Sequence, residues 1–297
     1  MLTKQDVIDV YIALLDREPE SDNVVEKHLK KHDNIRTLIK DIKNSYEFKQ
    51  KFIRKNIPDK IIVYIHIPKT AGTYLRTSWL LNNIKNYWWS DESKIYPNLN
   101  NLLKNYEIAS SFHLIGGHLN IDTFLQMSII QPKVFLNVLR EPVSRVISFY
   151  NYIKFRDLNH PLNRFVKNKT LYELLSSNTN FYKVIYKEQL RYIIANNLDN
   201  FSDKDIIIIG KQNKINDFVE TVCKVTNLKK IFIGGDTNKG EENYINRIQN
   251  EKDFDKAMLI LEKITKDESR LYNSIESVKI MKKNDYIKFV NEYKDIV

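Results

Sequence analysis

The chain has 297 residues, of which 42 % are hydrophobic and 28 % are charged, and its formal net charge is +10. This composition is typical of a soluble globular protein, and no apolar run is long enough to span a membrane. A single cysteine, Cys223, excludes an internal disulfide and indicates a reducing compartment. The charge predicts attraction to polyanions without choosing among nucleic acid, acidic polysaccharide and a phosphorylated cofactor.

The N-terminus has no signal-peptide core, so we expect a bacterial-type cytoplasmic protein, with a membrane-peripheral location as the alternative. The six histidines show no metal-ligand spacing such as HExxH, which predicts no metal.

Residues 1–56 are predicted to form a small helical module, separate from a main domain over residues 57–297. Apolar residues recur at helical spacing in two stretches, around Val7 to Leu15 and around Leu38 to Phe48, with a turn at DREPESDN between them. The segments YIALLDREPES and NSYEFKQKF resemble a small helical module of unknown role, DUF4214-like, that is attached to bacterial carbohydrate-active and surface-associated proteins. This resemblance implies a structural cap or a unit that docks a partner.

The main domain alternates short apolar runs with helical patterns, which predicts an α/β fold with a P-loop-like parallel sheet flanked by helices. Residues 82–110 are expected to form loops and short helices over the sheet edge. Four segments are the candidate strands: Ile61 to Ile67, Lys133 to Leu139, Asp205 to Ile209 and Lys230 to Gly234.

The loop PKTAGT follows the first of these strands and precedes a helical pattern. Pro68 suits a strand end, and Ala71 and Gly72 let the backbone approach a ligand closely. Thr70 and Thr73 are predicted N-caps of the following helix. The amides of a helix start and the ammonium of Lys69 both favour an anion, so the loop predicts an oxyanion site.

A Walker A loop reads GxxxxGK[ST], whereas this loop carries Lys69 before its only glycine. The order PKTAGT instead resembles the 5'-phosphosulfate loop of sulfotransferases that use 3'-phosphoadenosine 5'-phosphosulfate (PAPS), especially the carbohydrate 2-O-sulfotransferase branch. The resemblance implies a sulfotransferase fold, PAPS as co-substrate and a loop whose binding residues are Lys69, Thr70, Ala71, Gly72, Thr73 and Tyr74.

A second motif, LREPVSRVISFY, places Arg140 at the end of a predicted strand, where open α/β sheets bind ligands. Pro142 suits the first turn of the next helix, and Ser148 lies on its second turn. A guanidinium and a hydroxyl suit a phosphate monoester. The motif resembles the 3'-phosphate site of the same sulfotransferases, which implies that Arg140 and Ser148 bind the 3'-phosphate. We expect Arg145 to pair with a carboxylate.

A third motif, FHLIGGHLN, contains His113 and His118. Imidazole can accept a proton from an attacking alcohol at neutral pH. In the 2-O-sulfotransferases that the chain resembles, a similar step carries the proposed general base, which implies that role for His118. Gly116 stands where some relatives carry another histidine. His66 and His113 are expected to be structural.

Two further segments resemble the family more weakly. The loop GGDTNKGEE resembles the family's late loop over the nucleotide, which implies that Lys239 and Gly240 bind the cofactor, with Thr237 or Asn238 adding hydrogen bonds. A polar surface turn is the alternative. In IYKEQLRYI we expect scaffold residues, with Gln189 and Arg191 as candidate acceptor contacts.

The resemblance implies sulfuryl transfer from PAPS to a hydroxyl of an acceptor, a saccharide or glycolipid, with His118 as general base and Lys69 at the leaving group. Nucleic acid is not an expected partner. Two alternatives stay open. An ATP-dependent phosphotransferase needs a Walker A loop and an acidic Mg²⁺ ligand, and a non-catalytic polyanion-binding protein is motivated by the charge of +10.

Overall fold

The structure is a computed structural model that describes residues 2–45, 47–48, 58–90, 97–177, 179–233 and 244–297. The chain divides into two compact units. The first comprises Met1–Asp59, Ser93–His113 and Met127–Gln131, and the second comprises Lys60–Glu92, Leu114–Gln126 and Pro132–Val297. The predicted domain boundary between residues 56 and 57 lies outside the described residues.

The first unit is helical. Its N-terminal part consists of α1 (Lys4–Leu15), α2 (Asp22–Lys31) and α3 (Ile35–Asn44), and it also contains α7 (Leu99–Lys104) and α8 (Tyr106–Ser110). Thr3 and Asp6 form a capping box at the start of α1, and Asn34 caps α3. The predicted apolar faces are confirmed, because Val7 and Leu38 are fully buried in the core between these helices.

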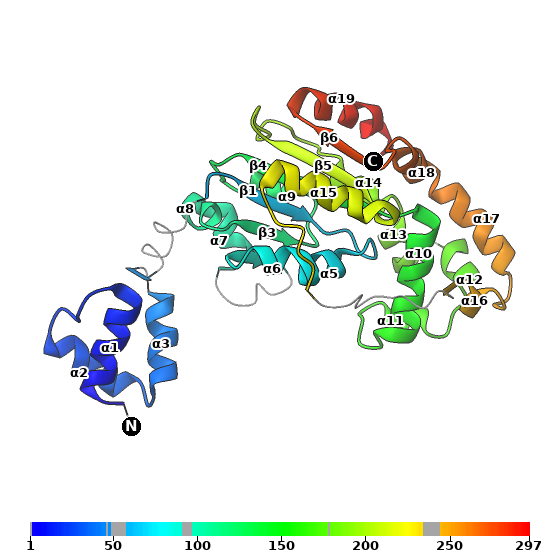
Figure 1. The fold of residues 1–297 in the computed structure, drawn as a ribbon. Helices are drawn as coiled ribbons and strands as arrows, with labels where there is room; N and C mark the ends of the chain where they lie inside the picture. Colours follow the sequence, from blue (N-terminus) through cyan, green and yellow to red (C-terminus); the bar gives the residue numbers. More distant parts are fainter. Residues whose placement is uncertain (1, 46, 49–57, 91–96, 178, 234–243) are drawn as a thin grey trace. The chain divides into compact units, whose positions relative to one another are not determined.

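The second unit contains a six-stranded sheet in the order β2-β3-β1-β4-β5-β6 (Figure 1). The first five strands run parallel, and β6 is antiparallel at the edge. The predicted α/β class with a mostly parallel sheet flanked by helices is therefore confirmed. The strands are β1 (Ile61–Ile65), β2 (Tyr87–Trp89), β3 (Leu114–Gly117), β4 (Lys133–Leu139), β5 (Ile206–Lys211) and β6 (Val278–Met281).

The register of the central strands determines which residues emerge together at one edge of the sheet. Ile65 at the end of β1 pairs with Gly117 of β3 on one side and with Asn137 of β4 on the other. The residues that follow these three strands therefore emerge at the same edge of the sheet, where parallel α/β proteins bind ligands.

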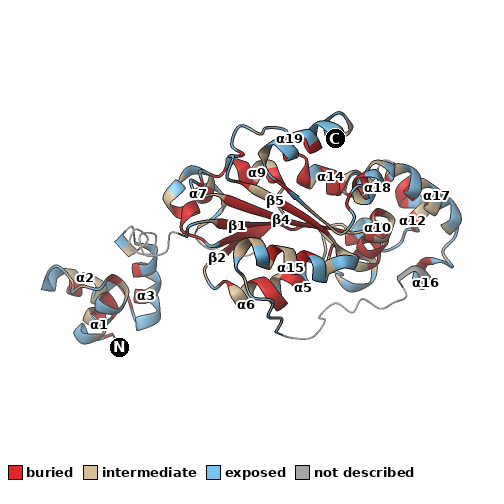
Figure 2. Cartoon of the chain, turned by 45° about the horizontal axis from the view of Figure 1, so that its top comes forward, coloured by how far each residue is buried: buried red, intermediate tan, exposed pale blue. Residues whose placement is uncertain are grey.

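Helices cover both faces of the sheet, so every residue of the central strands β1 and β4 is buried (Figure 2). On one face, Trp79 and Phe218 pack with Tyr64 and Leu136 of the strands. This cover is a continuous helical stretch of α5 (Gly72–Tyr74), the π-helix η1 (Leu75–Leu80) and α6 (Leu81–Asn83), together with α15 (Ile215–Thr226).

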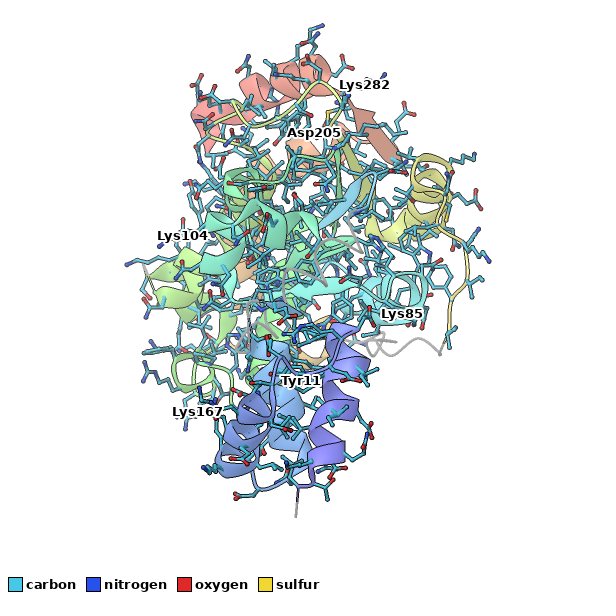
Figure 3. The ribbon with its side chains drawn as sticks, turned by 90° about the vertical axis from the view of Figure 1, so that its left-hand side faces the viewer. Tyr11, Lys85, Lys104, Lys167, Asp205 and Lys282 are labelled. Carbon is cyan, nitrogen blue, oxygen red and sulfur yellow. The ribbon has the colours of Figure 1, made fainter. Side chains whose placement is uncertain are left out.

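On the other face, the ring of Phe135 stacks on Phe201, which contacts Tyr286 of α19 (Lys283–Tyr293). At the base of this sheet, buried Lys133 pairs with Asp205, which is labelled in Figure 3. The remaining elements are α9 (Ile121–Gln126), α10 (Pro142–Asn151), η3 (Tyr152–Arg156), α11 (Asn163–Val166), α12 (Leu171–Ser176), α13 (Asn180–Ile185), α14 (Glu188–Ile193), η4 (Gln212–Lys214), α16 (Tyr244–Ile248), α17 (Phe254–Ile264), α18 (Lys266–Asn273) and η5 (Lys294–Ile296).

The predicted strand at Lys230 to Gly234 is wrong for residues 230–233, while residue 234 lies outside the described residues. These residues run along the helical stretch instead of joining the sheet. The amide of Ile233 donates to Ser78, and the indole of Trp79 donates to the carbonyl of Lys229. Phe232 stacks on Tyr74 and Trp79, so its apolar character serves helix packing.

Three strands were not predicted from the sequence: β2 and β6, which lie at the two edges of the sheet, and β3, which lies between β2 and β1. None of the helices in the described part of the chain combines the length and the apolar composition needed to cross a bilayer.

Candidate active site

The loop after β1 has an unusual backbone. Lys69 and Ala71 both have positive φ, at 69° and 70°, although neither is glycine. Alternation of backbone hand over consecutive residues turns successive amides toward one side, which is the geometry of an anion-binding nest. Thr70 is buried between them, and its hydroxyl donates to the carbonyl of Ile67, which fixes the loop.

The predicted N-caps at Thr70 and Thr73 are wrong. The helical stretch begins at Gly72, so Ala71 is the N-cap residue and Thr73 lies inside the first turn. Ala71 has no side chain that can accept a hydrogen bond, and none of the described residues caps the helix start with its side chain. Helix starts of this kind can bind an anion through their first amides.

Lys69 lies among other cations. Burial, together with the positive charges of Arg140 and Arg156, lowers its pKa to about 8. Its ammonium lies 4.1 Å from the centre of the Tyr152 ring. Positive charges held close together are stabilised by a bound anion.

Arg140 follows β4 directly, as predicted, and its guanidinium donates to the carbonyl of Lys69 at 3.3 Å. The side chain of Gln189 holds the main chain of Arg140 from both sides, because its oxygen accepts from the amide of Arg140 and its nitrogen donates to the carbonyl. Gln189 is fully buried, which identifies it as a scaffold residue rather than an acceptor contact.

A buried polar network fixes the start of α10. Glu141 is its N-cap and accepts from the amides of Val143 and Ser144. Arg145 is fully buried and pairs with Glu188, which confirms the predicted carboxylate partner. Glu268 accepts from the amide of Gln189, and burial raises the pKa of its carboxyl. The network ties α10 to α14 and α18, and so fixes where Arg140 stands.

Two residues that lie near Lys69 were not predicted from the sequence. Tyr152 and Arg156 lie in the π-helix η3, which continues α10 without a break. Ser148, Tyr152 and Arg156 are spaced four residues apart, so they share one helix face. Because Ser148 is a predicted site residue, this spacing could have identified the other two as candidates. Ser148 itself is buried, at 2 % exposure.

His118 follows β3 and is held in a defined orientation. Its amide donates to the hydroxyl of Ser90, and its Nδ1 lies 2.8 Å from the carbonyl of His66. A carbonyl only accepts, so Nδ1 carries the hydrogen, and in the neutral ring Nε2 is the nitrogen with the lone pair. The ring is exposed and stacks on His66 at 4.1 Å between ring centres.

His66 links the loop to His118. Its ring is almost fully buried, and burial holds its pKa well below the ordinary value, so it stays neutral. A Cβ added at Gly72 would lie 1.8 Å from the His66 ring, so only glycine fits there. Likewise, a Cβ at Gly116 would lie 2.4 Å from Trp89. The Trp89 ring therefore fills the space beside Gly116.

Substituting Gly72→Ala is expected to lower stability by about 1–3 kcal/mol, because the new methyl group overpacks the His66 ring. Thermal or urea unfolding measures the loss. In a His66→Ala background, the same substitution should have a clearly smaller effect. An equal loss in both backgrounds would contradict this packing.

Four of the predicted residues, Lys239 and Gly240 with Thr237 and Asn238, lie outside the described residues. Arg191 is exposed and donates to the carbonyls of Lys183 and Val184. His113 is exposed at the start of β3.

The comparisons with known proteins agree with this geometry. The family model described as the sulfotransferase family matches residues 50–207, which is slightly more than half of the chain. The matched segment includes Lys69, His118, Arg140 and Ser148. A search of curated proteins found no match. The chain belongs to the sulfotransferase family.

Proposed function

We propose that the protein transfers a sulfuryl group from PAPS to a hydroxyl of a carbohydrate acceptor, with His118 as general base. Sulfuryl transfer in general follows from the family. The main support for PAPS as the donor is a group of three cations at the edge of the sheet where β1 and β4 end. These cations are Lys69, Arg140 and Arg156.

The residues after β1 suit a 5'-phosphate. Two left-handed residues and an uncapped helix start leave backbone amides pointing to one side. We assign the contact to Lys69, Thr70, Ala71, Gly72, Thr73 and Tyr74. Lys69 neutralises the negative charge that grows on the leaving phosphate. Because the ammonium is already in position, the site does not have to rearrange during the reaction.

The residues after β4 suit a second phosphate. Gln189 holds the main chain of Arg140, and the guanidinium of Arg140 donates to the carbonyl of Lys69. Ser148 lies on the helix that follows. We assign both to the 3'-phosphate, which distinguishes PAPS from ATP. Arg156 adds positive charge to the same cluster. Lys239 and Gly240 complete the proposal as parts of the loop over the nucleotide.

His118 suits proton abstraction. PAPS supplies an activated sulfuryl group on a phosphate leaving group. The hydrogen bond from Nδ1 to the carbonyl of His66 leaves Nε2 able to accept the proton of the acceptor hydroxyl. The His66 carbonyl also stabilises the positive ring that results.

The proposal of a carbohydrate acceptor rests on the resemblance of the PKTAGT loop and the GGH motif to the carbohydrate 2-O-sulfotransferases.

We propose that residues 1–56 form a separate helical module that docks a partner or caps residues 57–297. Transfer of radiolabelled sulfate from PAPS to a panel of cell-derived glycans, glycolipids and tyrosine-containing peptides tests the proposed sulfuryl transfer. Label in a saccharide supports it, whereas label only in peptide tyrosine or in no acceptor contradicts it.

The affinity for adenosine 3',5'-bisphosphate is expected to depend on Lys69 protonation. The free enzyme has a Lys69 pKa of about 8, and a bound phosphate favours the protonated amine. Affinity is therefore full below pH 8 and falls above it, by up to about tenfold per pH unit until the amine is neutral in both states. Calorimetric titrations from pH 7 to pH 10 measure this. Lys69→Ala should be flat over the same range, and a parallel fall in that variant would refute the assignment.

A further inference from the structure

Three potential metal ligands converge in the N-terminal helices, far along the chain from the residues discussed so far. His28 lies in α2, His32 directly follows it, and Asp41 lies in α3. One ligand atom from each lies within 4.8 Å of the others. Histidines four residues apart share one helix face, so both rings can reach a single ion.

The distances between these ligand atoms would fit a metal ion after small side-chain movements. Nε2 of His32 lies 3.1 Å from Oδ2 of Asp41, and Nδ1 of His28 lies 4.0 Å from the same oxygen. Ligands about 2.1 Å from a tetrahedral zinc ion lie roughly 3.4 Å apart. One pair is thus slightly closer than needed and the other slightly farther away.

The orientation of His28 leaves a coordinating lone pair toward this cluster. Its Nε2 lies 2.9 Å from the hydroxyl of Tyr11, while its buried Nδ1 has no hydrogen-bond partner among the described residues. A hydrogen on Nδ1 would be left unsatisfied, so we assign it to Nε2, which donates to Tyr11. Metal-ligating histidines hold their second ring nitrogen in this way. Tyr11 is labelled in Figure 3 among the N-terminal helices.

The ammonium of Lys31 lies at the Asp41 carboxylate, where a metal ion would bind. Its ammonium lies 3.0 and 2.9 Å from the two carboxylate oxygens of Asp41. The side chain of Lys31 is 62 % exposed, so it can withdraw into water at small cost when a divalent ion replaces it. The cluster therefore already stabilises positive charge beside two imidazoles.

We propose that His28, His32 and Asp41 bind a divalent transition-metal ion of the zinc type, with water as the fourth ligand. Two imidazoles and one carboxylate are the donor set that such ions prefer. The ion would join α2 to α3, with Tyr11 of α1 in support. The core between these helices is small, and small helical units are those that gain most from a metal. This site is independent of the proposed sulfuryl transfer.

Cobalt(II) titration of the full chain without an affinity tag tests the site, because tetrahedral cobalt has an intense visible spectrum. We expect saturation at one ion per chain, displacement by zinc, and binding at least about tenfold weaker in His32→Gln and Asp41→Asn. Tyr11→Phe should weaken binding less than these two. His113→Gln, which removes an exposed histidine outside the cluster, is the matched control and should bind as the wild type does.

Lys31→Met separates a metal site from a simple ion-pair network. Without the competing ammonium, cobalt should bind several-fold more tightly, whatever happens to the stability of the apo protein. Circular dichroism verifies that each variant is helical. Absence of a tetrahedral spectrum in the wild type and in Lys31→Met, or equal affinity in all folded variants, would overturn the proposal.

Discussion

Replacing Lys69 with alanine is expected to lower turnover about 10³-fold, while the affinity for adenosine 3',5'-bisphosphate at pH 7 falls no more than about tenfold. The reason is that negative charge on the leaving phosphate increases as the bond to sulfur breaks. A positive charge fixed in a buried position therefore stabilises the transition state more than the bound nucleotide.

Initial rates of sulfate transfer at saturating PAPS, together with calorimetry, separate these two effects. Lys282→Ala is the matched control, because Lys282 is exposed at the start of α19 (Figure 3). It should leave both quantities unchanged. If Lys69→Ala weakened nucleotide binding as much as it lowered turnover, Lys69 would be a binding residue and its role at the leaving group would be wrong.

Replacing His118 with alanine is expected to lower turnover about 10²- to 10⁴-fold, the usual contribution of a positioned general base. Nucleotide affinity should be unchanged within about twofold, because Nε2 acts on the acceptor hydroxyl. The fold should tolerate the change, since the His118 ring is exposed.

Added imidazole should restore part of the activity of His118→Ala and none of that of Lys69→Ala, since it replaces a base and not a fixed charge. The matched control is His113→Ala, which removes another exposed histidine at the opposite end of β3. Full turnover in His118→Ala, or the same loss in His113→Ala, would refute the general-base assignment.

The sequence predicted the central part of the fold because buried parallel strands are continuous apolar runs. The segments that became β1, β4 and β5 were each located to within a few residues. Lys69 and Arg140 directly follow such runs, so their convergence at one sheet edge could be expected from topology alone. The hydrogen bond from Arg140 to the Lys69 carbonyl agrees with that expectation.

Other features depend on partners that a local pattern does not contain. The run at Lys230 to Ile233 is as apolar as a strand, but it packs on Tyr74 and Trp79, which lie about 150 residues earlier. The short edge strand β2 lies in a segment without clear periodicity. The role of Gln189 likewise depends on Arg140, which is 49 residues away in the sequence.

The same limit applies to metal ligands. The prediction of no metal rested on local motifs such as HExxH, whereas the cluster in the N-terminal helices combines His28 and His32 with Asp41 of the next helix. A carboxylate on a separate helix becomes a candidate ligand only when the helix packing is known.

The proposed function requires that the site recognise a 3',5'-bisphosphorylated adenosine through fixed positive charges. Calorimetric titration of the wild type with adenosine 3',5'-bisphosphate, 5'-AMP and ATP, each in the presence of EDTA, tests it most directly. We expect the bisphosphate to bind at least about 100-fold more tightly than 5'-AMP or ATP, since two charge-assisted phosphate contacts are formed. Equal affinity for the three nucleotides would contradict the proposed function.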